Sequence, residues 1–228
     1  MKTALKQALE LVLSGNDQLL DIIGVTLKMS LSSSLAALLL GVPLGVLLAT
    51  SSLPGKKTLI VINRTLMGLP PVVVGLLCYM LFSGVGPLRH FNLLFTVKAM
   101  IIAQIILITP IITGTTESSL APIAPDIMET AKGLGLKSGR ILILTVGESR
   151  YQLFSTYLLG FARATAEVGA VSMVGGAIAY KTNVMTTAIM NYTNMGNFTL
   201  GVALGIILLV LSLAVNITIW LIQARLTR

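Results

Sequence analysis

Charged side chains are scarce in this chain. Asp, Glu, Lys and Arg make up only 11% of its 228 residues, whereas soluble globular domains contain about 25%. Hydrophobic residues reach 55%, and the mean hydropathy is +0.92. Most of the surface of such a chain does not face water, so the composition excludes an ordinary soluble domain and indicates an integral membrane protein.

Cysteine and histidine each occur once. The single Cys78 excludes an intrachain disulfide and a cysteine-based zinc site. A histidine-based metal site or a Ser-His-Asp triad would have to be built on His90 alone. We therefore expect no metal site, no catalytic residue and no cofactor bound by this chain itself.

Aromatic residues are also few, at 5% of the chain, and they form no stripe between basic residues. The net charge of +8 would suggest a nucleic-acid partner in a soluble protein. Here the basic side chains lie mostly in short segments between apolar runs, which indicates membrane topology instead. We expect membrane lipid, and no nucleic acid, to contact the chain.

What the sequence does have is long apolar segments. A bilayer is crossed by about 20 helical residues, and runs of this length are too long for barrel strands. We therefore expect an all-α, polytopic membrane helical bundle that forms one integral domain over residues 1–228. The predicted spans are 19–49, 58–82, 97–116, 153–178 and 200–222.

Lysine and arginine are unevenly distributed between the two sets of loops. The loops after the first, third and fifth spans carry Lys56, Lys57, Lys132, Lys137, Arg140, Arg150, Arg225 and Arg228. The opposite side carries only Lys2, Lys6, Arg89 and Lys181. Because basic loops stay in the cytoplasm, we expect the N-terminus outside and the C-terminus in the cytoplasm.

Proline interrupts the second predicted span at Pro70-Pro71. A proline inside a helix removes one backbone hydrogen bond and clashes with the preceding turn. In lipid such a break is tolerated where neighbouring helices or water satisfy the freed groups. The break predicts either a static kink that packs well or a bend that lines a pathway or a hinge, and the sequence leaves these alternatives open.

Two Gly-x-x-x-Gly patterns occur, at Gly41 and Gly45 and at Gly201 and Gly205. Small residues at this spacing let membrane helices approach each other closely. With 21 glycines in the chain, each match alone is weak. Together they favour a tight bundle rather than a lone anchor.

The fourth predicted span contains two charges, Arg163 and Glu167. A charge at the bilayer centre costs about 2.5–3.5 kcal/mol on insertion scales. Residues four apart share a helix face, so the two can pair. The pair is either a structural salt bridge, or a site where Arg163 borders the path of an anion. A pairing role predicts that the charge-swapped double variant is damaged less than either single variant.

Between the third and fourth spans, residues 118–152 form a basic, turn-rich loop. Asp126 can cap a short helix, and Glu129 stands at capping-box spacing from it. We expect a helix over 127–132, stopped by Gly133 and Gly135. A helix of two turns between prolines and glycines is either an ordinary interfacial helix or a docking site for another protein.

This loop resembles the Glu-Ala-Ala…Gly loop by which the permeases of bacterial ABC importers contact their ATPases. Glu129, Ala131 and Gly135 match that pattern, with Thr130 where Ala is common. The family's downstream Ile-x-Leu-Pro is missing near 145–148. The resemblance implies a cytoplasmic coupling helix, with Asp126 at its start.

The resemblance extends along nearly the full chain. Residues 63–76 are similar to the second span of molybdate and tungstate permeases, and residues 167–176 with 184–189 look like the tungstate branch. The family implies the permease subunit of an ATP-driven importer for an oxyanion, tungstate first and molybdate next. It also implies a homodimer in a bacterial or archaeal cytoplasmic membrane, two cytoplasmic ABC ATPases and an extracytoplasmic oxyanion-binding protein.

An ATP site in the chain itself is not expected. The phosphate loop needs Gly-x-x-x-x-Gly-Lys-Ser/Thr, and the nearest segment, at Gly55-Lys56-Lys57, has Thr50 and Lys57 at two required positions. The chain is therefore no enzyme, and ATP and Mg²⁺ would be bound by the partner ATPase. The alternative is a stand-alone secondary anion transporter or channel. Secondary transporters often contain inverted repeats, and five spans do not divide into two halves.

Overall fold

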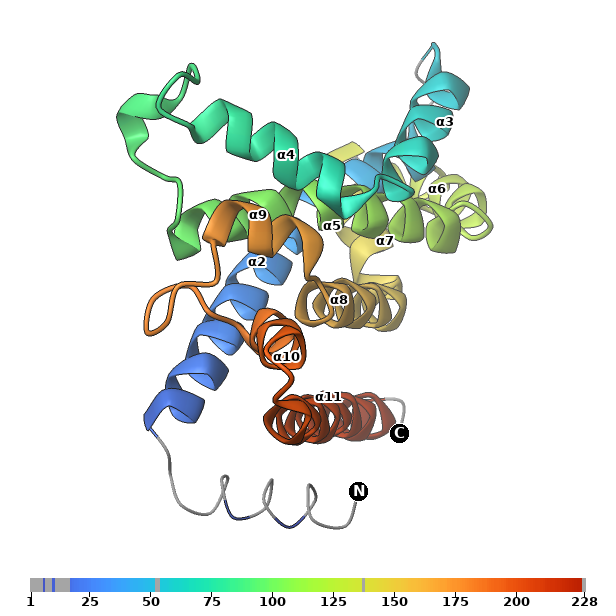
Figure 1. Cartoon of the computed structure of the whole chain (residues 1–228). Coiled ribbons are helices and arrows are strands. Elements are labelled where there is room, and N and C mark those ends of the chain that lie inside the picture. Colours follow the sequence, from blue (N-terminus) through green and yellow to red (C-terminus); the bar gives the residue numbers. More distant parts are fainter. Residues whose placement is uncertain (1–5, 7–9, 11–16, 52–53, 137, 227–228) are drawn as a thin grey trace. The chain divides into compact units, whose positions relative to one another are not determined.

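The computed structural model describes residues 6, 10, 17–51, 54–136 and 138–226. This part of the chain contains helices and short turns and no strand, which confirms the predicted all-α membrane fold. The helices are α2 (Asp17–Thr50), α3 (Lys56–Met67), α4 (Pro71–Phe82), η1 (Arg89–Phe91), α5 (Val97–Leu120), α6 (Ala124–Gly133), α7 (Ser138–Glu148), α8 (Arg150–Thr165), α9 (Gly169–Gly175), α10 (Met185–Asn194) and α11 (Phe198–Leu226) (Figure 1).

Three helices in the described part are long and apolar enough to cross a membrane: α2, α5 and the segment Phe198–Thr218 of α11. The pair α3 and α4 adds a fourth if the two act as one span. These elements lie where the first, second, third and fifth spans were predicted.

The break at Pro70-Pro71 bends the second predicted span by 93°. α3 ends at Met67, and the backbone N–H of Gly68 donates to the carbonyl of Thr65 (3.1 Å). Pro71 is the first residue of α4, where its missing N–H costs no helical hydrogen bond. Residues 58–82 are therefore two helices rather than one kinked helix.

The fourth predicted span, 153–178, is also divided. α8 ends at Thr165 and α9 covers only Gly169–Gly175, so residues 166–168 interrupt the helix. Hydropathy does not detect this break, because the residues on both sides of it are mostly apolar. The expectation of a single continuous helix here is corrected.

The chain divides into two compact units, each built from separate stretches of sequence. Unit 1 contains Met1–Ser33, Pro70–Gln104 and Ala162–Arg228, and unit 2 contains Ser34–Leu69 and Ile105–Phe161. Both α2 and α5 contribute to each unit. The single integral domain over 1–228 stays a prediction.

In unit 1, α4 packs on α9 and α10 packs on α11 (Figure 1). One apolar core cluster is formed by Leu19, Ile22, Met185, Ala188 and Leu204. Polar contacts inside this unit also join distant segments. The hydroxyl of Thr26 in α2 accepts the backbone N–H of Met185 at the start of α10 (2.9 Å).

In unit 2, the glycines of the first Gly-x-x-x-Gly pattern lie directly against α5. A Cβ on Gly41 would lie 2.8 Å from Cγ2 of Ile112, and a Cβ on Gly45 would lie 2.5 Å from Cβ of Thr116. Any larger residue would push the helices apart. The two backbones therefore approach as closely as the sequence pattern predicts.

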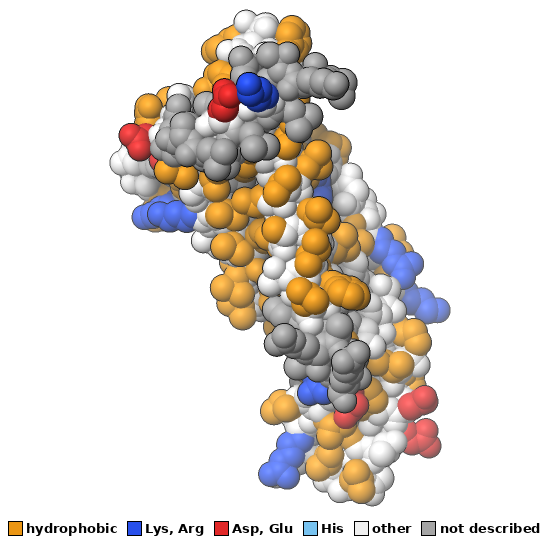
Figure 2. Space-filling view, turned by 90° about the horizontal axis from the view of Figure 1, so that it is seen from below, with side chains coloured by type: hydrophobic (Ala, Val, Ile, Leu, Met, Phe, Trp, Pro, Cys, Tyr) orange, Lys and Arg blue, Asp and Glu red, His pale blue; other side chains and the backbone are white. Residues whose placement is uncertain are grey.

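The outer faces of the helices carry large apolar side chains. In α11, Leu209, Leu213 and Trp220 are 71%, 60% and 64% exposed. Hydrophobic side chains cover much of the face drawn in Figure 2, and charged side chains appear there in small separate groups. Such a surface is suited to lipid rather than to water.

We expect Gly45→Ala to lower the free energy of unfolding by about 1–3 kcal/mol, because the added methyl group overpacks the contact with Thr116. Gly24→Ala in the same helix is the control, since no heavy atom lies within 4 Å of a Cβ there. That change should stabilise α2 by up to about 1 kcal/mol. Thermal unfolding of the purified protein in detergent measures both. Equal stability of the two variants would contradict the close packing of α2 on α5.

Candidate functional site

The loop between α5 and α8 is built mainly from two short helices, α6 and α7, which pack against each other. α6 begins at Ala124 rather than at residue 127 and ends at Gly133. Asp126 therefore lies inside the first turn, not at the N-cap, so the expected capping box with Glu129 is corrected. A carboxylate in the first turn still interacts favourably with the helix dipole.

The residues of α6 divide into an exposed group and a buried face. Asp126, Glu129 and Thr130 are exposed, and the Thr130 hydroxyl donates to the carbonyl of Asp126 (2.9 Å). Ala131 is only 1% exposed. Its side chain is covered by this chain itself, and its contact with a partner stays a prediction. The exposed group is available to another protein.

Gly135 determines how α6 ends. It adopts a left-handed conformation (φ 70°), which glycine accepts without steric cost. The backbone N–H of Leu136 then donates to the carbonyl of Ala131 (3.0 Å), the long bond of a Schellman motif. Gly135 therefore has a backbone role, and its match to the family pattern is explained by the turn that it makes.

The helix α7 was not predicted from the sequence. This helix buries Ile141 and Thr145, one turn apart, and leaves Ile143 exposed. The four-residue spacing of Ile141 and Thr145 is the sequence signal for a helix here. The β-branched residues around them are also typical of a strand. α6 and α7 together give the loop a folded structure where only one short helix was expected.

At the end of α8, Arg163 and Glu167 form an ion pair, with Nη1 and Oε2 3.1 Å apart. The Glu167 side chain is 4% exposed and the Arg163 side chain 36% exposed. The other carboxylate oxygen, Oε1, accepts the backbone N–H of Ala170 in the first turn of α9 (3.1 Å). Glu167 therefore joins the two helices across their break.

Further hydrogen bonds hold the same region. The hydroxyl of Thr186 in α10 donates to the carbonyl of Glu167 (2.9 Å). Gln104 in α5 donates to the carbonyl of Ala164 (2.8 Å) and accepts from the hydroxyl of Ser33. These buried partners satisfy backbone groups that the helix break frees. The break is thus fixed from α2, α5 and α10.

A second ion pair lies in unit 2 and was not predicted. Arg64 of α3 and Glu117 of α5 approach to 3.8 Å, with side chains 65% and 8% exposed. The amide of Asn63 also donates to the carbonyl of Pro110 (3.0 Å). Both contacts attach α3 to α5.

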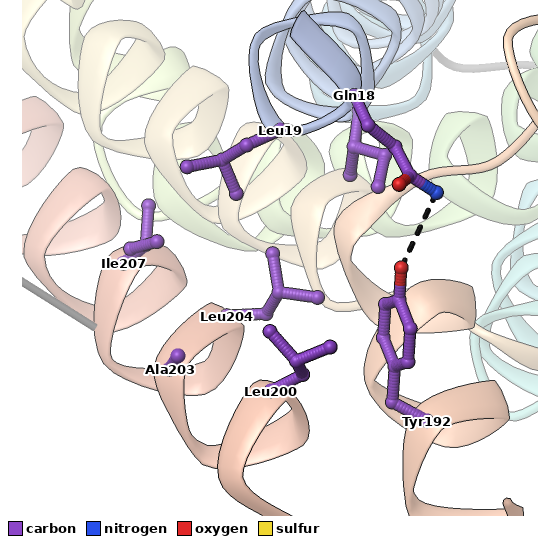
Figure 3. A pocket seen from close by; sticks show the side chains of 8 residues that line it. Gln18, Leu19, Tyr192, Leu200, Ala203, Leu204 and Ile207 are labelled. Carbon is purple, nitrogen blue, oxygen red and sulfur yellow. Dashed lines mark hydrogen bonds between the residues drawn. The ribbon is translucent and has the colours of Figure 1, made fainter. Parts of the chain in front are cut away.

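A hollow of about 170 Å³ lies between the start of α2, α10 and α11. At its edge Gln18 donates to the hydroxyl of Tyr192 (3.3 Å), and Leu200 and Leu204 line its wall (Figure 3). All of its lining residues are uncharged, so it offers no cation to an anion. In the described part of the chain, no cluster of His, Cys, Asp or Glu is arranged to hold a metal ion.

Comparison of the chain with known proteins identifies its class. Residues 41–228 match the family "Binding-protein-dependent transport system inner membrane component". The tungstate uptake system permease protein TupB of Peptoclostridium acidaminophilum is 35% identical over 96% of each chain. TupB of Campylobacter jejuni is 36% identical, covering 92% of this chain and 88% of that protein. A probable anion ABC transporter permease of Haloferax volcanii is 37% identical, covering 87% and 88%.

The fold is also found in a solved structure. An inward-facing conformation of the MetNI methionine ABC transporter contains a chain that superposes with a TM-score of 0.77 at 20% identity, covering 92% of this chain and 96% of that one. At this identity the likeness shows the fold alone. The fold is that of a polytopic membrane permease.

The chain belongs to the family of inner membrane components of binding-protein-dependent transport systems. It is a multi-pass inner membrane protein and the permease component of an ABC transporter, which is not itself catalytic.

The contacts of Glu167 predict a graded response to substitution. Glu167→Leu should lower stability by about 1–3 kcal/mol, because the N–H of Ala170 loses its acceptor and Arg163 loses its partner. Glu167→Gln keeps an acceptor oxygen and should cost less. The charge-swapped double variant should not recover, since arginine has no acceptor for Ala170, which revises the prediction from spacing alone. Unfolding in detergent compares the variants, and full recovery by the double variant would refute the role at Ala170.

Proposed function

We propose that this chain is the permease subunit of an ATP-driven importer for an oxyanion, tungstate first and molybdate next. The observation that carries the proposal is the similarity to tungstate uptake permeases over nearly the whole chain. A molybdate/tungstate permease of Pyrococcus furiosus, 27% identical over 83% of this chain, supports the same group of substrates.

The proposed complex contains two copies of this chain, two cytoplasmic ABC ATPases and an extracytoplasmic oxyanion-binding protein. The ATPases would bind ATP and Mg²⁺, because the segment around Lys56 lacks the residues of a phosphate loop. The N-terminus would lie outside and the C-terminus in the cytoplasm, as the basic loops indicate. Selectivity would reside mainly in the binding protein, so the path itself would need only modest affinity.

We assign the contact with the ATPase to the exposed group of α6. Asp126, Glu129 and Thr130 project from one short helix. The packing of α6 on α7 and the turn at Gly135 hold this helix as a rigid body. A push on α6 would therefore reach α5 and α8, the helices on either side of the loop.

For the translocation path we assign Arg163, the more exposed partner of the buried pair. Its charge is offset by Glu167 at 3.1 Å, so it presents a weak positive surface. An anion held weakly is released quickly, as import requires. The bend at Pro70-Pro71 turns α4 away from the direction of α3. α4 packs on α9.

Tungstate uptake tests the function directly. In cells lacking this chain, high-affinity uptake of tungstate should fall to background and return with the intact gene. Molybdate should compete with tungstate less well than unlabelled tungstate does. Rapid downhill flux of tungstate through the chain alone in liposomes would instead support a stand-alone transporter.

Charge reversal tests the contact with the ATPase. Glu129→Arg should lower the amount of ATPase that co-purifies with this chain by about tenfold or more, because a like charge then faces the partner's site. Glu148→Arg, a reversal at another exposed glutamate at the end of α7, is the matched control and should retain the ATPase. Equal retention by both variants would place the contact elsewhere.

A further inference from the structure

Unit 2 contains an apolar groove outside the site described above. Its volume is about 630 Å³, and it lies between α2, the end of α7 and the first half of α8. The wall from α2 includes Leu39 and Pro43, and the wall from α8 includes Leu153, Phe154 and Tyr157. The surface is almost wholly apolar.

The groove opens toward the medium around the chain. Leu35 and Leu39, which line it, are 53% and 68% exposed. They belong to α2, which is long and apolar enough to cross a membrane. In a bilayer the medium at this depth is hydrocarbon, so an acyl chain is the occupant that matches the walls.

One charged side chain stands at the groove, and it is basic. Arg150, the first residue of α8, is exposed, and its Nη2 donates to the hydroxyl of Tyr151 (3.0 Å). The guanidinium carbon lies 4.9 Å from the centroid of the Tyr151 ring. These contacts hold Arg150 in place while other guanidinium N–H groups stay available. These remaining N–H groups can donate charge-assisted hydrogen bonds to a phosphate group.

The basic side chain lies at the membrane end where anionic lipid is concentrated. The groove follows the later part of α2, the part that leads to Thr50 and Lys56, and Arg150 directly follows the α6–α7 segment. Both belong to the side with the greater number of basic residues, which we assign to the cytoplasm. The cytoplasmic leaflet carries the negative surface potential of anionic lipids.

We propose that this groove binds one anionic phospholipid, with an acyl chain between α2 and α8 and the phosphate at Arg150. The lipid would fill the space between the two helices next to the α6–α7 segment. Membrane composition would then affect how firmly this segment is anchored. The inference rests on the proposed orientation, which places Arg150 at the cytoplasmic end of the membrane, and it is independent of which oxyanion is carried.

Lipid retention tests the proposal. The full chain, purified with its partners in mild detergent, is mixed with phosphatidylcholine or phosphatidylglycerol, and bound lipid is counted by native mass spectrometry. Arg150→Gln should lower the retained phosphatidylglycerol about fivefold, the effect of one basic contact with an anionic surface, and leave phosphatidylcholine unchanged. Arg140→Gln, an exposed arginine of α7 outside the groove, is the matched control.

A second pair of variants tests the apolar part. Leu39→Trp fills the groove and should lower retention of both lipids, whereas Leu40→Trp, on an exposed part of α2 outside the groove, should not. The proposal fails if Arg150→Gln and Arg140→Gln retain equal lipid, or if inorganic phosphate displaces the lipid. It also fails if Leu39→Cys forms disulfides between copies of the chain, since the occupant would then be a second copy. Tungstate uptake, measured in parallel, tests the transport function separately.

Discussion

A break in a membrane helix frees backbone amides and carbonyls that hydrocarbon cannot satisfy, and in this chain Glu167 repairs such a break. One carboxylate oxygen accepts the N–H of Ala170 at the start of α9, and the other pairs with Arg163 at the end of α8. The side chain is nearly fully buried, so its charge is tolerated only because both oxygens are occupied. Glu167 thus links the end of α8 to the start of α9, and the hydrogen bonds of Gln104 and Thr186 hold the same break.

Contacts between residues close together in the chain could be predicted from the sequence. Arg163 and Glu167 are one turn apart, so helical geometry alone brings them together. Gly41 and Gly45 place two small residues on one face of α2, where a neighbouring helix can approach closely. That neighbouring helix is α5. The break at Pro70-Pro71 follows from the chemistry of proline. The family pattern located the α6 loop, but it did not indicate which side of α6 is covered by the chain itself, as Ala131 is.

Contacts between distant segments were not predictable in the same way. The pair Arg64 and Glu117 joins two helices that are separated along the chain, and nothing in the spacing of charges identifies it. The interruption at 166–168 was hidden because an apolar stretch has the same hydropathy whether it forms one helix or two. The helix α7 was hidden by β-branched residues such as Ile141 and Thr145, whose preference for strands is overridden when packing against α6 provides a buried face.

The contact of Gly41 and Gly45 with α5 has a mechanical consequence. Because the side chains of Ile112 and Thr116 lie directly against the glycine backbone, sliding one helix along the other would drive them into main-chain atoms. We therefore expect these parts of α2 and α5 to move together as one rigid body. The pivots of that motion have to lie elsewhere along the chain, where side chains separate the helices and can repack.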